Sequence, residues 1–276
     1  MSTIVEMFSH AFLVRAVVVG LLVSLCAALL GVNLVLKRYA MIGTGLSHVG
    51  FAAMIIAGVI DVAPLALAMP VVVIAAFLLL RLNESSRVNG DSAVALISTS
   101  GLAIGVIVMG LTTGITLHIC NILFGSILAM TRMDVWVSII LAVVVLLLFV
   151  LFYKQLFAVT YDESFAKATG TKVEVYKSLL AILTAATVVL GMRMMGAVLI
   201  SSLTIFPALS AMRLCKRFLS VVITAAIVAV ICFFAGMVVS YELFLPPGAS
   251  VVGVNLIVYM VFCLIGILRG KRRASA

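Results

Sequence analysis

The chain has 276 residues, of which 66% are apolar and only 10% charged, and its formal net charge is +9. This composition excludes an ordinary soluble domain, in which roughly a quarter of the residues are charged, and predicts a helical protein that crosses the membrane many times. A basic chain can bind nucleic acid, but basic residues in a membrane protein gather on the cytoplasmic side, so no nucleic-acid partner is expected.

Apolar runs bounded by charged or turn residues predict an all-α fold of about nine membrane-spanning helices in a single domain, residues 1–276. A further run at 117–130 is too short to cross a bilayer and is expected to be a re-entrant or interfacial helix. The sixth and seventh spans are short and could instead form one unit broken around Gly191–Gly196. The expected spans are 12–36, 40–60, 64–82, 93–115, 134–153, 177–191, 197–212, 218–240 and 249–268.

The distribution of lysine and arginine predicts the orientation. If the C-terminus is cytoplasmic, all but three of the 18 basic residues lie inside, and the exceptions are Arg15, Arg132 and Arg193. Such an asymmetry is typical of a correctly oriented membrane protein. With an odd number of spans, the N-terminus is expected outside.

The second span carries an unusual group of polar residues. His48 lies near its middle, and an ionisable side chain inside a bilayer is a functional candidate by default, although it could also be a packing histidine bonded to a carbonyl on another helix. Thr44 shares its helical face, because the two are four residues apart. Ser47 points roughly 100° away, so Ser47 and His48 are poorly placed as a nucleophile and base.

Glycines and prolines mark close packing or gating positions. Small residues let another backbone approach, and the fourth span has GxxxG spacing at Gly101–Gly105 and at Gly110–Gly114. Pro207 is expected to bend the seventh span, and the YELFLPPG turn at 241–248 is expected to end the eighth helix sharply. The other positions of this kind are Gly43, Gly45, Gly50, Pro246, Pro247 and Gly248.

The segment 154–176 is expected on the cytoplasmic side and contains a short capped helix. Asp162 and Glu163 suit a helix start, Phe165 and Ala166 follow within a turn, and Gly170 suits the end. Such a helix is a plausible docking element for another protein. An interfacial helix lying on the lipid is the alternative, which the acidic start argues against.

Several motifs are absent from the sequence. It has no GxxxxGK[ST] phosphate loop, no HExxH and no GxSxG, so we expect neither ATP hydrolysis nor an intramembrane hydrolase. Five scattered cysteines indicate neither disulfides nor a cysteine zinc site. His118 and Cys120 are two apart and could be soft metal ligands or a packing pair.

An ordered set of short motifs resembles the membrane subunit of bacterial ABC importers for zinc and manganese. The set includes the DExFAxxxG pattern that begins at Asp162, which resembles the family's coupling helix. It also includes Arg213. The other motifs are KRYAMIG at 37–43, LSH at 46–48, LFGSIL at 123–128, DV at 134–135, MGxxL at 195–199, PA at 207–208 and LPPGA at 245–249.

The resemblance implies a transport subunit of the bacterial inner membrane that is not itself an enzyme. It implies a second permease protomer, two cytoplasmic ATPase subunits that dock on the coupling helix, and an extracytoplasmic metal-binding protein. A divalent cation would pass between the two permease protomers.

One position departs from the family. The second span of these subunits commonly carries Asp four residues before His, and here that position is Thr44. Only His48 therefore carries over as a ligand, with Thr44 and Ser47 as neighbours. Two His48 side chains from two protomers would favour zinc over manganese, which prefers carboxylates; iron stays open. The rival function is a proton-coupled secondary transporter that uses His48 as a relay.

Overall fold

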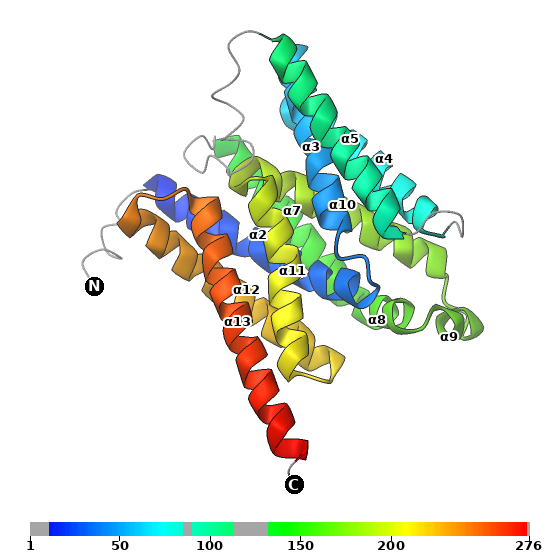
Figure 1. Ribbon diagram of the computed structural model, residues 1–276. Coiled ribbons are helices and arrows are strands. Elements are labelled where there is room, and N and C mark those ends of the chain that lie inside the picture. The colour runs from blue at the N-terminus through cyan, green and yellow to red at the C-terminus, as the bar shows by residue number, and fades with distance from the viewer. Residues whose placement is uncertain (1–10, 85–89, 113–131, 275–276) are drawn as a thin grey trace.

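The structure is a computed structural model that describes residues 11–84, 90–112 and 132–274. Every regular element in these ranges is an α-helix (Figure 1). The helices are α2 (Ala11–Leu36), α3 (Ile42–Val59), α4 (Pro64–Glu84), α5 (Gly90–Leu111), α7 (Arg132–Leu151), α8 (Tyr153–Tyr161), α9 (Glu163–Ala168), α10 (Val173–Met195), α11 (Ala197–Leu214), α12 (Phe218–Leu243) and α13 (Pro247–Ala274).

The described helices confirm the predicted membrane bundle. Eight of them are long and apolar enough to cross a membrane, and a bent pair could make a ninth span. That pair consists of α7 from Val135 onward and α8, which meet at 69°. The run 117–130, including His118 and Cys120, lies outside the described residues.

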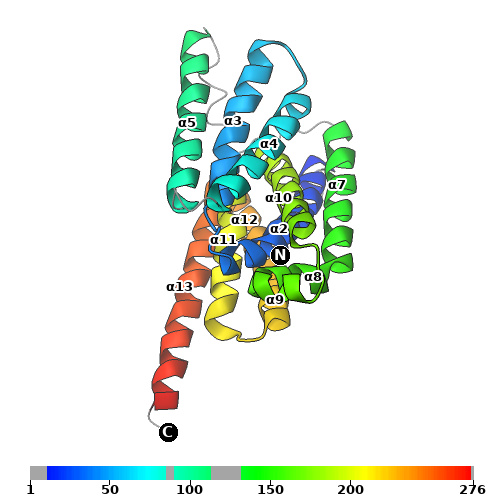
Figure 2. The ribbon, with the colours of Figure 1, turned by 90° about the vertical axis from the view of Figure 1, so that its right-hand side faces the viewer.

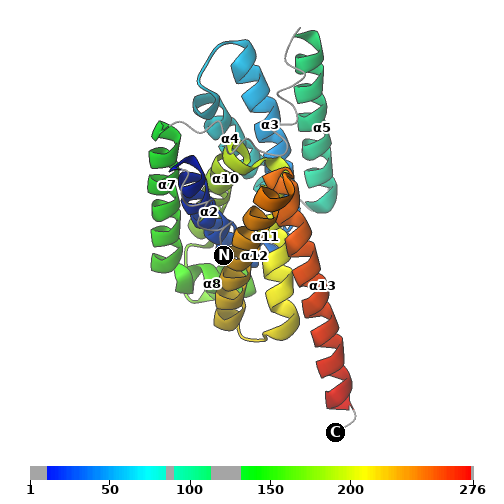
Figure 3. The same cartoon turned by 90° about the vertical axis from the view of Figure 1, so that its left-hand side faces the viewer.

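The bundle is organised around α10. This helix is buried along most of its length and packs against α2, α3, α4, α7 and α11. By contrast, α13 lies at the edge and leaves large side chains such as Ile257, Leu264 and Leu268 exposed. In Figures 2 and 3, α3, α4 and α5 lie together in the upper part of the molecule, and α13 extends to its lower end.

The sixth span is longer than expected, while the seventh begins where expected and ends two residues later. Helix α10 begins at Val173 and continues through Gly191 to Met195, so Gly196 is the single residue before α11. Gly191 does not break the helix: a Cβ there would meet the Ile200 side chain and lie 3.1 Å from Val23 Cγ1, so this glycine allows close packing. Gly196 is the break, because its φ of +91° suits glycine alone.

Close helix packing at Gly101 and Gly105 is confirmed. A Cβ on Gly101 would lie 3.1 Å from the Val49 backbone of α3, and one on Gly105 would lie 3.2 Å from Ala52 Cα. Gly110 differs, because nothing described lies within 4 Å of its Cβ position. Gly114 is outside the described residues. Helix α2 approaches α11 in the same way, since a Cβ on Gly31 would meet the Thr204 carbonyl.

The glycines of α3 pack to different degrees. A Cβ on Gly50 would lie 2.6 Å from Met192 Cε, and one on Gly45 would lie 3.1 Å from Val94 Cγ1. At Gly43 the nearest atoms belong to Thr204 at 3.7 Å, an ordinary contact. Only the first two positions therefore depend on the absence of a side chain.

The prolines fall at helix starts, inside helices and in the turn after α12. Helix α12 ends at Leu243, Phe244 is left-handed with a φ of 54°, and Pro247 opens α13. Pro246 lies in the turn, and Gly248 lies in the first turn of α13. Pro207 lies within α11, and α4 also contains Pro70.

One end of the bundle gathers nine of the 18 basic residues, and we call it the α9 end. Lys37 follows α2 and contacts α9, while Phe218 at the start of α12 packs on Phe157 of α8 with ring centroids 4.7 Å apart. The C-terminal end of α13 lies toward the same side in Figure 1. The loops and helix ends here carry Lys37, Arg38, Lys154, Lys167, Lys172, Lys177, Arg213, Lys216 and Arg217.

We expect Gly31→Ala to destabilise the protein by about 2 kcal/mol or more, because the added methyl group would overlap the Thr204 carbonyl and force α2 from α11. The measurement is the thermal unfolding midpoint of the detergent-solubilised protein. Gly110→Ala is the control, and it should lose no stability because its methyl group meets nothing described within 4 Å. Equal midpoints for the two variants would contradict the packing of α2 on α11.

Candidate functional site

His48 lies in the second turn of α3 and contacts α5. Its side chain is half-buried, and its Nδ1 lies 2.7 Å from the Oγ of Ser98. Ser98 is itself buried, with 9% of its surface exposed. The structure therefore holds the ring of His48 by one nitrogen and leaves Nε2 without a hydrogen bond to any described residue.

Ser47 and His48 face different helices, as their spacing predicts. Ser47 is fully buried, donates to the Thr44 carbonyl oxygen at 2.8 Å, and lies 3.3 Å from the Oγ of Ser201 in α11. Thr44 is half-buried, one turn before His48 on the same helical face. Thr44 therefore lies on the same face of α3 as His48, while the Ser47 side chain connects α3 to α11.

The described residues of one chain do not form a complete metal site. No group of three or more His, Cys, Asp or Glu side chains among them is placed to hold a metal ion. A tightly held zinc usually has three or four protein ligands. Within the described ranges, His48 is thus not joined by enough candidate ligands to hold a metal ion within one chain.

The short capped helix at 162–170 is confirmed as α9. Asp162 is its N-cap and accepts a hydrogen bond from the Phe165 backbone N–H at 3.0 Å. Gly170 follows the helix with a φ of +81°, a conformation that glycine adopts easily. Ala166 is fully buried against Val159 and Val173, so a small apolar cluster seats α9 on its neighbours.

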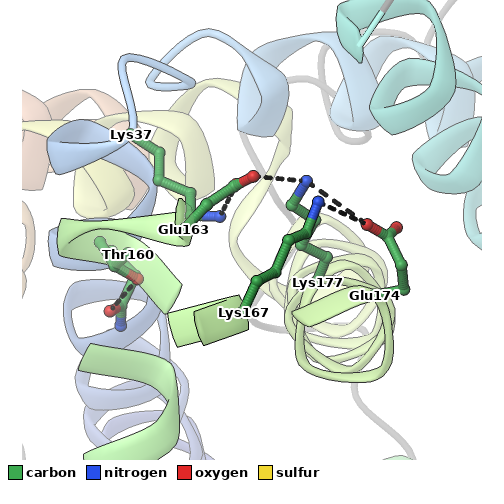
Figure 4. Close-up of polar contacts among 7 residues, drawn as sticks. Lys37, Thr160, Glu163, Lys167, Glu174 and Lys177 are labelled. Atoms are coloured by element: carbon green, nitrogen blue, oxygen red, sulfur yellow. Dashed lines mark hydrogen bonds and ion pairs between the residues drawn. The ribbon is translucent and has the colours of Figure 1, made fainter. Parts of the chain in front are cut away.

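Glu163 anchors α9 to the bundle through two lysines (Figure 4). Its Oε1 lies 2.9 Å from Lys37 Nζ and its Oε2 lies 2.8 Å from Lys177 Nζ. The side chains of Lys37 and Lys177 are only 6% and 9% exposed, while that of Glu163 is 37% exposed. One carboxylate thereby joins α9 to the end of α2 and to the first turns of α10.

The charges around Glu163 set its pKa. Partial burial pushes the pKa of this carboxyl upward, but hydrogen bonds from Lys177 and Lys37 and their positive charges outweigh burial and hold the pKa below its ordinary value. Glu163 is therefore ionised at neutral pH. A second link lies nearby, where Thr160 of α8 donates to the buried Asn33 Oδ1 of α2 at 3.0 Å (Figure 4).

Sequence reasoning expected Asp162 at the start of a capped helix but missed the two lysine contacts of Glu163. The sequence did hold a signal for these contacts. Lys37 and Lys177 lie at the ends of apolar spans, where the positive charge of a lysine favours a carboxylate partner. Phe165 differs, since it is 64% exposed, and Tyr161 beside it is 81% exposed. These two aromatic rings are the large apolar side chains that the segment exposes.

Among the described residues, eight helices long and apolar enough to cross a membrane define a multi-pass membrane protein. The chain belongs to the ABC 3 transport family, which it matches over residues 9–266. It is a multi-pass protein of the bacterial plasma membrane and the permease of a metal ABC importer, a transport component rather than an enzyme.

Three similar proteins illustrate the range of the family. The chain is 30% identical to the manganese transport system membrane protein MntC of Halalkalibacterium halodurans, covering 90% of this chain and 85% of that protein. It is 30% identical to the high-affinity zinc uptake system membrane protein ZnuB of Haemophilus influenzae, covering 86% and 91%. The solved structure of PsaBC from Streptococcus pneumoniae with a Fab superposes with a TM-score of 0.84 at 25% identity, covering 95% and 94%.

We expect Glu163→Gln to lower stability by about 1–2 kcal/mol, less than for a fully buried pair because the carboxylate is partly exposed. The loss comes from two buried ammonium groups that no longer contact the Glu163 carboxylate. Because folding lowers the pKa of Glu163, its contribution is full above the ordinary value of 4.5 and disappears as the pH falls below it. Unfolding midpoints measured from pH 7 to pH 3 should therefore converge for wild type and variant at the acid end.

The matched control is Glu174→Gln. Glu174 is 69% exposed and lies 3.9 Å from Lys177 and 4.0 Å from Lys167, so its loss should change the midpoint little. If the two variants behaved alike, Glu163 would not be the anchor of α9.

Proposed function

We propose that the chain is a zinc-importing permease in which His48 is a ligand on the transport path, completed by His48 of a second copy of the chain. The observation that carries the proposal is the half-buried His48 ring, bonded through Nδ1 to Ser98, with Thr44 one turn away. A site built from two imidazoles and hydroxyls suits zinc better than manganese, which prefers carboxylate oxygens.

The depth of His48 supports a role in transport. It lies six residues into α3, or roughly 9 Å along the helix, within an apolar core that is about 30 Å thick. Carriers place their binding sites near the middle of the bilayer. A site with few protein ligands also suits a permease, because the cation must leave as well as enter.

We further propose that the α9 end is cytoplasmic. The concentration of lysine and arginine there supports this orientation. Two ATPase subunits would dock on α9 through Phe165, with Tyr161 beside it, while Asp162 and Glu163 hold the helix in shape. An extracytoplasmic metal-binding protein would deliver the cation at the opposite end, where Phe244 lies.

We expect His48→Ala to reduce zinc uptake at least 100-fold in cells that lack other importers, because the pathway loses its nitrogen ligands. The variant should still reach the membrane and co-purify with its ATPase subunit. In the same assay, Thr44→Asp should shift the ratio of manganese to zinc uptake toward manganese, because it supplies the carboxylate that manganese prefers. Normal uptake by His48→Ala would remove His48 from the pathway, and a shift toward zinc in Thr44→Asp would contradict the basis for the zinc assignment.

We expect Phe165→Ala to weaken co-purification of the ATPase subunit, or to leave ATP hydrolysis without zinc uptake, because an exposed aromatic ring typically contributes heavily to an interface. The control is Phe244→Ala, which removes a ring that is 95% exposed at the opposite end. That change should leave ATPase binding intact. Equal ATPase binding and coupling in wild type and Phe165→Ala would show that docking uses another surface.

A further inference from the structure

Ser98 of α5 is buried, and its hydroxyl group contacts His48 of the neighbouring helix α3. Its Oγ lies 2.7 Å from His48 Nδ1, a short contact for this kind of hydrogen bond. The neighbouring Thr99 is exposed and donates to the Ala95 carbonyl oxygen of its own helix at 2.8 Å. Of these two adjacent hydroxyls, only that of Ser98 reaches α3.

The backbone fixes the height of Ser98 relative to His48. Gly101 lies one turn after Ser98, and a Cβ there would be 3.2 Å from the carbonyl carbon of His48. Gly105 repeats this close approach one turn further along α5. Because α3 and α5 meet backbone to backbone at these glycines, the Ser98 hydroxyl cannot slide along α3 without breaking the packing.

The chemistry of imidazole makes this contact consequential for a metal. A neutral imidazole carries its proton on one nitrogen and can bind a cation through the other, and the partner of the first nitrogen decides which is which. With the proton on Nδ1, His48 donates to Ser98 Oγ, and Nε2 keeps a lone pair. With the opposite tautomer, Ser98 would donate to Nδ1 and Nε2 would carry a proton that blocks the cation.

We propose that Ser98 is a positioning residue for cation recognition, which fixes the orientation of the His48 ring through Nδ1 and aims Nε2 into the transport path. The inference rests on the proposed role of His48 as a ligand. A hydroxyl strengthens the imidazole less than a carboxylate partner would, so the contact orients the ring without making the site too tight for release.

The test is zinc uptake at varied zinc concentration by the assembled transporter, in cells that lack other importers. Ser98→Ala should raise the KM for zinc about tenfold and change Vmax little, as expected when the partner of a metal-binding histidine is lost. Ser98→Thr keeps the hydroxyl and should restore the KM. Thr99→Ala, which removes a hydroxyl that bonds its own helix, should match wild type.

A second pair of variants separates positioning from packing. Thr and Val have nearly the same shape, so Ser98→Thr and Ser98→Val differ chiefly in the hydroxyl, and only Ser98→Val should show the raised KM. If both variants raise the KM equally, or if Ser98→Ala leaves or lowers it, Ser98 does not orient the ring. This pair decides the question even if Ser98→Ala fails to accumulate.

The same experiment distinguishes the inference from the function on which it rests. His48→Ala is measured beside the Ser98 variants. If His48→Ala abolishes uptake while Ser98→Ala and Ser98→Val keep the wild-type KM, only the role of Ser98 is refuted. If His48→Ala transports zinc normally, the proposed function fails first and the role of Ser98 fails with it.

Discussion

The pairing of Glu163 with Lys37 and Lys177 is the interaction on which the α9 end depends. Two ammonium groups are almost completely removed from solvent there, and the Glu163 carboxylate contacts both of them. Lys177 belongs to α10, the centre of the bundle, and Lys37 begins the loop that leads into α3. One carboxylate therefore links α9 both to the central helix and to the loop that precedes the helix carrying His48.

Features decided by local chemistry could be predicted from the sequence. The apolar spans, the Asp162 cap and the packing of Gly101 follow from hydropathy, capping preference and small-residue spacing, which neighbouring residues alone reveal. Features that depend on distant residues could not. Glu163 meets Lys37 across 126 positions of sequence, Ser98 is an ordinary serine until α5 is placed on α3, and Gly191 resembles a break until Ile200 is seen to fill its space. The role of His48 as a ligand stays a prediction.

Two polar residues of α3, Ser47 and His48, face different neighbouring helices. Ser47 faces α11 and completes its hydrogen bonds inside the protein, so it needs neither water nor metal. His48 faces α5 and uses one nitrogen there. In apolar surroundings, a polar atom without a hydrogen bond lowers the stability of the protein. A functional role would explain why the chain keeps a histidine whose Nε2 has no hydrogen bond to a described residue. A symmetric second copy would present the same nitrogen from the opposite side.

The turn at Gly196 has a mechanical consequence. Helix α10 leaves the α9 end, and α11 returns toward it, with one residue between them. Neighbouring Cα atoms are about 3.8 Å apart, so the two helices cannot shear past one another at this turn by more than a fraction of a helical turn. The two helices are thus held together at Gly196, far from α9. Any opening between α10 and α11 must therefore be widest at the α9 end and smallest at Gly196.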